Sequence, residues 1–513
     1  MVNYLHKAAS ISALTLVSRV LGVIRDGFIA YVFGASMVSD IFFIIFRPFD
    51  VLRKMVSDGI LSISFIPVFS AYLAGNRKDQ AVAMFSSGLI LISLFSAAVI
   101  SFGVVFAPLV VNLLAPGYAG DTYAQALAAL LLKFMLPYLF TILGVALSMG
   151  VLNSMGHFYI PAATPIILNL VIIGVTLFLG EWFEPRILVL GAGVALGGIC
   201  QLCLQVPSLA RCGMFARHRF QLIHPGMLRA GKTIVPAMVG AAAFQINILA
   251  AGLMATTLVP GSVSFLYYAE RLVQFPLALL VTSVSTVFLP ALSGKAATRR
   301  LNEVQPAFDA AVRLVFFMAI PAMAGIMALN RPIVGLLFGR GAFDSAAVAQ
   351  TGDCLFYLVS GLWAVAGTRL FTTLHYARSN IRLPFFAGLM TIGSNLVIAG
   401  FLVGPMGVSG LALSVALSSA LGFVFLVTRS GTGIGLGRLG VCACRALFIS
   451  GIMAVLVRWL GGFWLSGGSL VQGIGLFATI GAGAGFFFFG AALLGAPEIS
   501  VLKKVFLGKN DHG

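Results

Sequence analysis

Residues 19–58 read RVLGVIRDGFIAYVFGASMVSDIFFIIFRPFDVLRKMVSD, and the charges in this stretch constrain the fold more than any other part of the chain. Between its charges the stretch is almost entirely apolar. The charged side chains are Arg19, Arg25, Asp26, Asp40, Arg47, Asp50, Arg53, Lys54 and Asp58. This density is unusual, because only 9% of the whole chain is charged. A basic side chain at the centre of a membrane helix costs about 2.5–3.5 kcal/mol on insertion scales, so these residues require a water-filled cavity or an anionic partner.

The composition of the whole chain is that of a membrane protein. It has 513 residues, 60% of them hydrophobic, and a mean hydropathy of +1.05. Long apolar runs separated by short polar loops predict an all-α protein that crosses the membrane many times. The apolar run after His6 and Lys7 is too long for a secretory signal and lacks a small-residue cleavage site, so we expect the first helix to be retained.

About fourteen hydrophobic segments can be drawn along the chain. They cover approximately 9–33, 38–73, 81–111, 124–152, 158–180, 186–210, 230–258, 263–292, 306–329, 345–376, 384–403, 407–428, 439–460 and 469–495. The second segment is longer than one membrane span and contains Pro48 and Pro67. We expect it to bend at a proline or to end in a surface turn.

The basic residues are distributed unevenly between the predicted loops. Loops after even-numbered segments, the N-terminus and the C-terminal tail carry most of the 32 Lys and Arg, whereas loops after odd-numbered segments carry few. This alternation predicts that both termini lie in the cytoplasm. It also explains the net charge of +17 without a nucleic-acid partner. We expect amphipathic surface helices around 211–229 and 331–341.

The chain repeats itself at an offset of 223 residues. FIPVFS at 65–70 resembles FLPALS at 288–293, and Pro161 and Pro384 share the same offset. Each of these prolines is followed by the sequence NLVI, at 169–172 and at 395–398. The repeats predict two six-helix lobes in parallel orientation, 1–223 and 224–438, followed by two additional helices and a basic tail in 439–513.

Two groups of charged residues are candidates for binding a substrate. If the second segment stays helical through Pro48, Arg47, Asp50, Lys54 and Asp58 lie on one stripe. This stripe could neutralise itself or reach water at a helix end, which is the alternative interpretation for Lys54 and Asp58. We expect Arg19, Arg25 and Arg53 to face a cavity. Because arginine favours bidentate contact with phosphate or carboxylate, the substrate is predicted to be an anion.

The second half of the chain contains the matching motif YYAER at 267–271. Adjacent residues on a helix point in different directions, so Glu270 and Arg271 are expected to have different roles. We predict that Arg271 contacts the substrate and that Glu270 has a structural or gating partner. Arg369 is a further cavity candidate, whereas Arg313 and Asp353 are predicted to be intramolecular partners or interface residues.

Several literal motifs are rejected. GLGRLG at 435–440 has the spacing G-x-G-x-x-G, but no strand or βαβ unit surrounds it, so it is predicted to be a loop. Cys200 and Cys203 form a C-x-x-C within an apolar segment and are expected to pack there. No acid pair for Mg²⁺, Ser/His/Asp set or zinc spacing is found. The sequence therefore predicts no catalytic residue, no metal site and no cofactor, and leaves a coupling ion open.

Four motifs together resemble a known family. SRVLGVIRD at 18–26, FGA at 33–35 with Asp40, LRK at 52–54 and YYAERL at 267–272 resemble the MurJ (MviN) family of bacterial lipid II flippases. This family belongs to the superfamily of multidrug and toxin extrusion (MATE) transporters and polysaccharide-lipid flippases. The resemblance covers nearly the whole chain.

The resemblance implies a transporter of the bacterial inner membrane that is not an enzyme. Its two lobes would surround a central cationic cavity open to the cytoplasm, and its two C-terminal helices would form a groove for a polyprenyl tail. Substrate-binding residues would be Arg19, Arg25, Arg53 and Arg271, with Arg47 and Arg369 at positions where the family often has lysine. Gating or charge-pairing residues would be Asp26, Asp40, Asp58 and Glu270. Glu270 and Asp58 depart from the family's usual Asp and Glu, respectively, so their pairing distances stay open.

The implied partners are lipid II, membrane lipids and other cell-wall synthesis proteins. The implied mechanism is alternating access, in which the membrane potential helps an anionic headgroup to move outward. A related lipid-linked saccharide stays open as the cargo. A MATE-type drug exporter is the other alternative, but it would be expected to use carboxylates for cationic drugs. An enzyme acting on polyprenyl phosphate would be expected to carry acid pairs for Mg²⁺.

Overall fold

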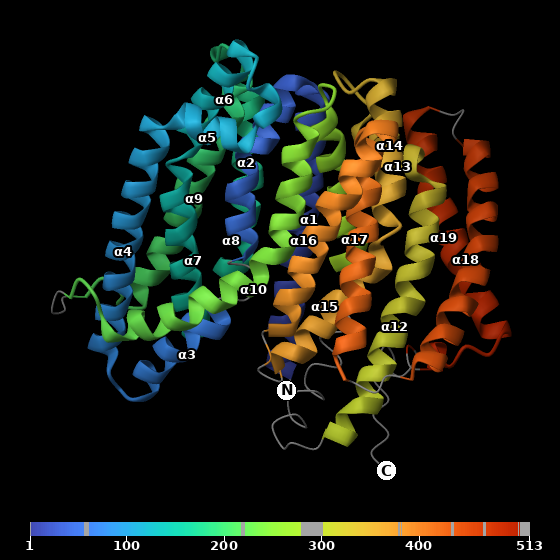
Figure 1. Cartoon of the computed structure of the whole chain (residues 1–513). Coiled ribbons are helices and arrows are strands. Elements are labelled where there is room, and N and C mark those ends of the chain that lie inside the picture. The colour runs from blue at the N-terminus through green and yellow to red at the C-terminus, as the bar shows by residue number, and fades with distance from the viewer. Residues whose placement is uncertain are drawn as a thin grey trace. The chain divides into compact units, whose positions relative to one another are not determined.

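The structure is a computed structural model that describes residues 2–55, 61–216, 221–278, 301–377, 380, 382–431, 435–464, 468–500 and 502. Within these ranges the chain is helical and contains no strand (Figure 1). Asp58, the second repeat copy at 288–293 and the basic tail from Lys503 lie outside the described residues.

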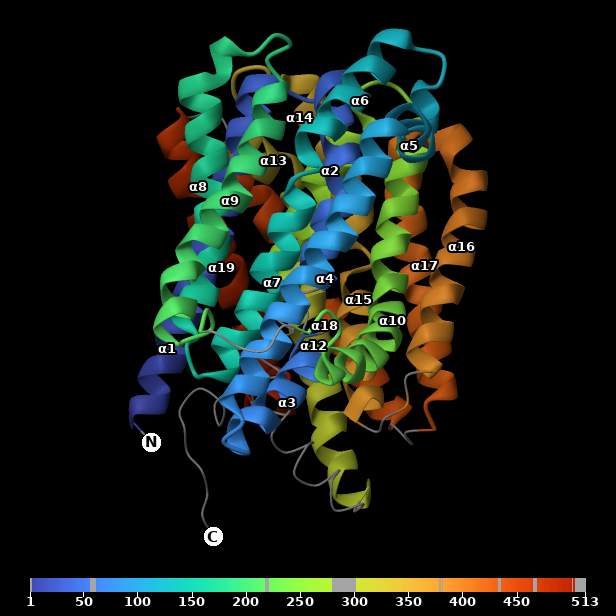
Figure 2. The same ribbon diagram turned by 90° about the vertical axis from the view of Figure 1, so that its left-hand side faces the viewer.

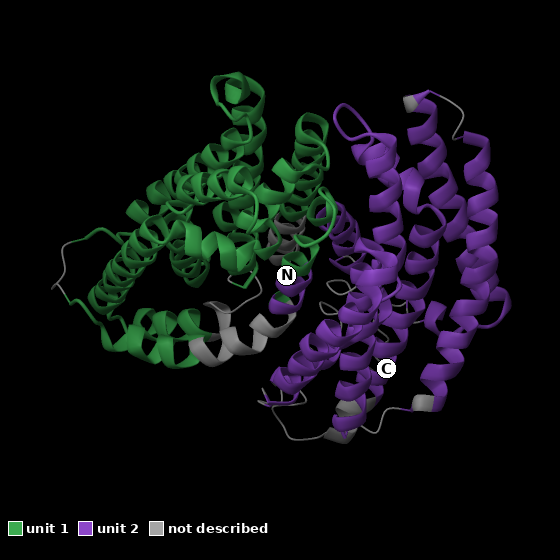
Figure 3. Cartoon of the chain, turned by 45° about the horizontal axis from the view of Figure 1, so that its top comes forward, with its two compact units in different colours: residues 1–245, 252–264 green, residues 246–251, 265–513 purple. Residues whose placement is uncertain are grey.

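The first of two compact units comprises residues 1–245 and 252–264 (Figure 3). Its helices are α1 (Val2–Phe33), α2 (Met37–Met55), α3 (Leu61–Ala74), α4 (Lys78–Val105), α5 (Ala107–Leu114), α6 (Thr122–Met135), α7 (Tyr138–Ser154), α8 (Tyr159–Leu179), α9 (Leu188–Arg211) and most of α10 (Pro225–Ala255). Short 3₁₀ turns, η2 (Pro116–Tyr118) and η3 (Gly180–Trp182), follow α5 and α8. Helices α8 and α9 lie side by side, and α9 also packs against α7 (Figure 2).

The second unit comprises residues 246–251 and 265–513. A helix over 262–278 runs into it. Its other helices are α12 (Leu301–Ala328), α13 (Asn330–Phe338), α14 (Ser345–Val359), α15 (Leu362–Ala377), α16 (Arg382–Met406), α17 (Val408–Arg429), α18 (Leu436–Trp464) and α19 (Ser469–Leu493). The two C-terminal helices belong to this unit, where α18 packs along α12, and α19 packs against α18. The predicted domain boundaries at 223 and 438 stay predictions.

The internal repeat extends to whole helices. In two pairs of helices whose starts both lie within the described residues, the second helix starts 223 residues after the first: α5 and α13, and α6 and α14. The helix caps repeat as well. Asp121 accepts a hydrogen bond from the backbone N–H of Ala124, and Asp344 accepts one from Ala347. Such shared local detail confirms that the chain contains a duplicated set of helices in the same order.

The number of membrane spans agrees roughly with the predicted fourteen. In the part of the chain that the structure describes, nine helices are long and apolar enough to cross a membrane, and α14 and α15, bent by 47°, make a tenth together. The four other predicted segments overlap α1, α2 with α3, α10 and the helix over 262–278. They are the first two segments of each predicted lobe, and they contain most of the candidate substrate residues.

Three details bear on the sequence predictions. Helix α2 (Met37–Met55) continues through Pro48, so this proline does not break it. The predicted surface helix around 331–341 is present as α13, whereas the one around 211–229 stays a prediction, because 217–220 lie outside the described residues and 225–229 belong to α10. Cys200 and Cys203 are free and exposed and therefore do not pack in a core.

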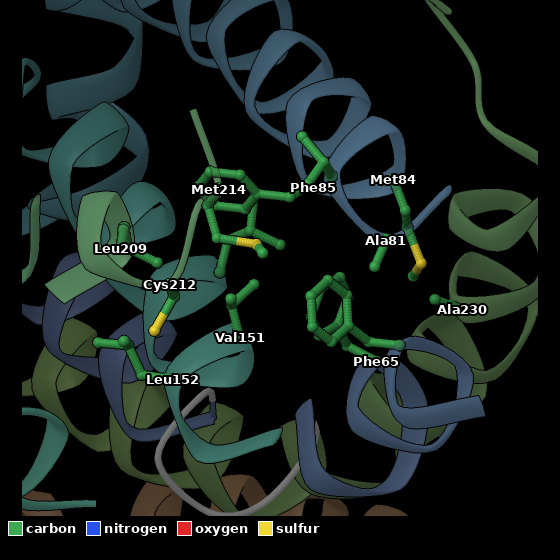
Figure 4. Close-up of a cluster of buried hydrophobic side chains, with 13 residues drawn as sticks. Phe65, Ala81, Met84, Phe85, Val151, Leu152, Leu209, Cys212, Met214 and Ala230 are labelled. Carbon is green, nitrogen blue, oxygen red and sulfur yellow. The ribbon is translucent and has the colours of Figure 1, made fainter. Parts of the chain in front are cut away.

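A buried apolar cluster joins α3 to its neighbours in the first unit (Figure 4). Phe65 and Phe69 of α3 stack with ring centroids 5.3 Å apart. They lie among Met84 and Phe85 of α4 and Val151 of α7, all nearly inaccessible. Because close packing leaves little room for side-chain movement, this cluster holds α3 firmly against α4 and α7.

Candidate substrate-binding residues

The turn between α1 and α2 determines where α2 begins and therefore places Asp40 in its first turn. Gly34 has a φ of +62°, a conformation that side chains with a Cβ rarely adopt. The backbone N–H of Ser36 then donates to Ser39 Oγ at 2.8 Å, and the N–H of Ser39 reaches Ser36 Oγ at 3.4 Å. These reciprocal bonds satisfy donors at the start of α2. Asp40 consequently lies in the first turn of α2.

Arg25 and Asp26 form a buried ion pair in α1. Their side chains are 5% and 1% exposed. The Nε and Nη2 groups of Arg25 donate to Asp26 Oδ1 at 3.0 and 2.6 Å, and Nη1 donates to Asn169 Oδ1 of α8 at 3.1 Å. Asn169 in turn donates to the carbonyl oxygen of Ser18 at 3.1 Å. The charge of Arg25 is therefore offset by its own neighbour, in a network that joins α1 to α8.

Asp50 of α2 is shared by two cations. Its buried carboxylate accepts Arg53 Nη2 at 2.5 Å on Oδ1 and lies 3.0 Å from Lys54 Nζ on Oδ2. Lys54 thus belongs to a self-neutralising group, as the alternative interpretation of the stripe proposed. The buried Nε of Arg53 has no hydrogen-bond partner among the described residues.

Tyr138 of α7 connects these two groups and was not predicted from the sequence. It is fully buried, and its ring lies 6.2 Å from that of Phe49. The Tyr138 hydroxyl interacts electrostatically with three charged side chains, those of Arg53, Asp50 and Arg25. The hydroxyl itself has no hydrogen-bond partner among the described residues. The fold therefore brings the predicted residues Arg25 and Arg53 around one buried phenol.

The two other predicted arginines of this unit lie in different environments. Arg19 in α1 is half-buried, and none of the described carboxylates lies within ion-pair distance of it. Arg47 in α2 is buried, with 6% of its surface exposed. Both arginines are therefore at least partly removed from solvent, as expected for candidate cavity residues.

Asp40 is not paired with a cation but holds a network of neutral donors. Its Oδ1 accepts from the N–H and the hydroxyl of Ser264 at 2.7 and 2.6 Å. Its Oδ2 accepts from the N–H of Gly261 at 2.7 Å and from the hydroxyl of Tyr118 at 3.2 Å. Gly261 and Ser264 flank the start of the helix over 262–278, where backbone N–H groups lack helical partners. Asp40 thus serves as the N-terminal cap of a helix that is distant in sequence.

In the second unit, Glu270 and Arg271 contact residues on either side along their helix. Glu270 Oε1 accepts from Gln274 Nε2 at 2.6 Å, one helical turn ahead. Arg271 donates to the hydroxyl of Tyr267 at 2.9 and 3.2 Å, one turn behind. Its guanidinium also lies 5.2 Å from the centre of the Tyr267 ring. Both residues are half-buried, so a ligand could reach the guanidinium.

The remaining candidates occupy scattered positions in the second unit. Arg369 lies on an exposed part of α15. Asp353 of α14 pairs with Arg331 of α13 at 3.1 Å, consistent with the intramolecular role predicted for it. Among the described residues there is no group of three or more His, Cys, Asp or Glu that could hold a metal ion.

Comparison with known proteins gives a consistent result. The family described as "Lipid II flippase MurJ" matches residues 29–479. The chain is 34% identical to the "Probable lipid II flippase MurJ" of Buchnera aphidicola subsp. Acyrthosiphon pisum over 424 residues, covering 83% of each protein. It is 34% identical to the protein of the same description from Vibrio cholerae over 426 residues, covering 81% of each.

Solved structures agree with the sequence comparison. A structure titled "Lipid II flippase MurJ, inward closed conformation" has a TM-score of 0.80 and 25% identity, and the match covers 94% of this chain and 98% of that one. A MATE-family multidrug transporter in an inward-facing conformation has a TM-score of 0.67 at 12% identity, covering 84% of this chain and 94% of that one, which shows a shared fold. The names in the matched family describe transporters, not enzymes. From its sequence motifs, its duplicated helices and these matches, the chain belongs to the MurJ family of multi-pass membrane proteins.

Proposed function

We propose that this protein moves lipid II, the polyprenyl-pyrophosphate-linked peptidoglycan precursor, from the cytoplasmic to the outer leaflet of the bacterial inner membrane. The observation that carries the proposal is the buried charge network of α1 and α2, in which Arg25 and Arg53 surround Tyr138. Buried cations are costly in a membrane protein and mark ion or substrate pathways. Membership of the MurJ family supports lipid II as the cargo.

The geometry of Arg25 suggests how a pyrophosphate is held. The Nε and Nη2 edge of its guanidinium already faces an anionic oxygen, that of Asp26, at 3.0 and 2.6 Å. A phosphate oxygen is a suitable acceptor for the same edge, because arginine binds carboxylate and phosphate with the same fork geometry. Binding would then exchange Asp26 for the pyrophosphate. Arg53 would contribute its unpartnered Nε, and Arg19 and Arg271 would add further positive charge.

Transport is proposed to follow alternating access. The headgroup binds from the cytoplasmic side, the two units rearrange, and the headgroup is released on the outer side while the polyprenyl tail stays in lipid near α18 and α19. Both termini would lie in the cytoplasm. A potential of 100 mV, negative inside, favours the outward movement of each negative charge by about 2.3 kcal/mol. An ion-coupled cycle is an additional possibility that the same transport assay addresses.

A depletion and rescue experiment tests the cargo and the role of the arginines. Variants Arg25→Ala and Arg271→Ala are expressed in a bacterium from which the native flippase has been depleted, and the sidedness of lipid II is followed. We expect both variants to fail to rescue growth and to leave lipid II in the inner leaflet. Full rescue with normal outward lipid II in both variants would contradict the proposal.

A double variant separates substrate binding from structural neutralisation. Arg25→Ala alone leaves Asp26 as an uncompensated buried charge, which is destabilising in itself. Arg25→Ala combined with Asp26→Ala removes the pair together. If Arg25 binds the substrate, the double variant is stable but inactive. Recovery of transport in the double variant would show that Arg25 serves only to neutralise Asp26.

Purified protein in liposomes tests the energetic part of the proposal. Lipid II is placed in one leaflet, and its appearance in the other is measured with and without an imposed potential and ion gradients. We expect faster outward movement when the starting side is negative. Equal rates with and without the potential would remove the voltage dependence, and a rate that follows one ion gradient would replace it with ion coupling.

A further inference from the structure

A second cationic cavity lies within the second unit, among helices α12, α13, α14, α16, α17 and α18. It has a volume of about 570 Å³ and is lined by Met327, Asn330, Arg331, Asp353, Phe356, Tyr357, Met406, Ser409 and Arg458. A volume of this order suits a small ligand or a lipid headgroup. None of its lining residues is among the candidate substrate residues described above.

The cavity is built by specific contacts between α13 and α14. Asn330 Nδ2 donates to the carbonyl oxygen of Gly352 at 2.9 Å, and Arg331 pairs with Asp353 at 3.1 Å. Gly352 is needed for this arrangement, because a Cβ there would lie 2.7 Å from Arg331 Cγ. These bonds hold the first turn of α13 against α14 and fix the direction of the Arg331 side chain.

The residues that line this cavity carry a net positive charge and several hydrogen-bond donors that are free to contact a ligand. Arg331 and Arg458 outnumber Asp353, which gives a net charge of +1. Within the described part of the chain, the exposed guanidinium of Arg458 and the half-buried hydroxyls of Tyr357 and Ser409 have no hydrogen-bond or ion-pair partner and are therefore accessible to a ligand. Helices α13 and α17 also begin at this cavity, at Asn330 and Val408, and helix N-termini favour anions.

Arg331 and Arg458 occupy positions where this chain otherwise has few basic residues. Arg331 and Arg458 come from predicted loops after odd-numbered segments, which otherwise carry few basic residues. Arg458 lies in the last third of α18 (Leu436–Trp464), towards the predicted loop that follows it. The ends of membrane-spanning helices lie near the headgroup region, where lipid phosphates are found. Met327, Phe356 and Met406 provide apolar surface beside the cationic groups.

We propose that this cavity binds the phosphate of an anionic lipid headgroup, with Arg458 as the principal contact and Arg331 as a second. Tyr357 and Ser409 donate hydrogen bonds to the phosphate oxygens. Asp353 orients Arg331 and limits the affinity by its negative charge. The site lies on helices other than α1 and α2 and does not depend on which cargo those helices carry.

Native mass spectrometry of the full chain in detergent tests this site with phosphatidylglycerol as the probe. Arg458→Gln is expected to weaken binding about tenfold, the effect of one charge-assisted hydrogen bond. Asp353→Asn is expected to strengthen binding, because it removes the only negative charge of the lining. Arg429→Gln, at the other end of α17, is the matched control and should change binding less than twofold. Misfolding cannot produce these opposite signs, since it would weaken binding in both cavity variants.

The experiment distinguishes a lipid headgroup from a free phosphate ion as the molecule that binds in this cavity. Phosphatidylcholine, which adds a cationic group to the same phosphate, should bind more weakly than phosphatidylglycerol. Equal binding of the two lipids, or equal loss in Arg458→Gln and Arg429→Gln, would overturn the proposal. Binding of inorganic phosphate that depends on Arg458, without binding of phosphatidylglycerol, would identify a site for a free anion and would also overturn it.

Discussion

The network around Asp40 leads to a quantitative prediction for stability. Asp40→Ala removes an acceptor for four hydrogen bonds, from Gly261, Ser264 (N–H and hydroxyl) and Tyr118. Two of the donors are backbone N–H groups at a helix start, which would be left unsatisfied in a buried position. Loss of a helix cap costs about 0.5–2 kcal/mol, and each buried donor left without an acceptor costs about 1–3 kcal/mol. We therefore expect the free energy of unfolding to fall by about 3–5 kcal/mol.

Smaller changes at the same network should give a graded series. Tyr118→Phe removes only the longest bond and is expected to cost about 1 kcal/mol. Asp40→Asn should fall between the two variants, because its amide group can replace one carboxylate oxygen but would direct an N–H₂ towards another donor. For a unit of this size, 1 kcal/mol corresponds to about 2–4 °C in Tm.

The assay is thermal unfolding of the purified protein in detergent, followed by intrinsic fluorescence. Asp40→Ala should lower Tm by about 10 °C, and Tyr118→Phe by about 2–4 °C. Equal shifts in Asp40→Ala and Tyr118→Phe would refute the reasoning, because the backbone donors would then contribute nothing. If Asp40→Asn had the same Tm as the wild type, two acceptor oxygens at this position would not be required, and the reasoning would be refuted.

Three further predictions concern the first unit. Asp50→Asn should slow transport in liposomes and lower Tm, since it removes the negative charge that contacts both Arg53 and Lys54; a wild-type rate and Tm would contradict this. Gly117→Ala should lower Tm by several degrees, because its Cβ would overlap the backbone of Thr256, whereas Gly120→Ala, with open space around it, should leave Tm unchanged. Burial, followed by the charge of Arg229, lowers the pKa of His224, whose Nδ1 accepts from a backbone N–H at the start of α10. The stabilisation from neutral His224 is therefore present above the ordinary pKa of 6.5 and is lost as the pH falls through the lowered pKa. The Tm of the wild type should therefore fall more on acidification than the Tm of His224→Asn. Equal falls in Tm would contradict this prediction.

The sequence predicted the helices and their duplication well because both are local or repetitive properties. Apolar runs of sufficient length form helices in a membrane regardless of their neighbours. The offset of 223 residues, visible in a few short matches, recurs in the start positions of two helix pairs, α5 and α13, and α6 and α14. The surface helix expected around 211–229 stays a prediction, because 217–220 lie outside the described residues.

Side-chain partners were harder to predict than helices. Spacing predicted different roles for Glu270 and Arg271, and their contacts with Gln274 and Tyr267 extend one turn in opposite directions. The same spacing rule gave no indication of the ion pair between Arg25 and its neighbour Asp26. A long arginine side chain can fold back onto an adjacent residue when burial deprives both of water, and that burial depends on α8 packing against α1.

By itself, the sequence determined the membrane-spanning helical class, the internal repeat, the family resemblance and the set of charged residues in α1 and α2. Only the tertiary structure determined what those charges contact. Three of the four hydrogen bonds to Asp40 come from residues more than 220 positions away, and Asp50 and Arg25 act on Tyr138, which lies on another helix. Hydropathy is a sum over neighbouring residues and can be read along the chain, whereas a hydrogen bond depends on distances of about 3 Å between groups that only the folded chain brings together.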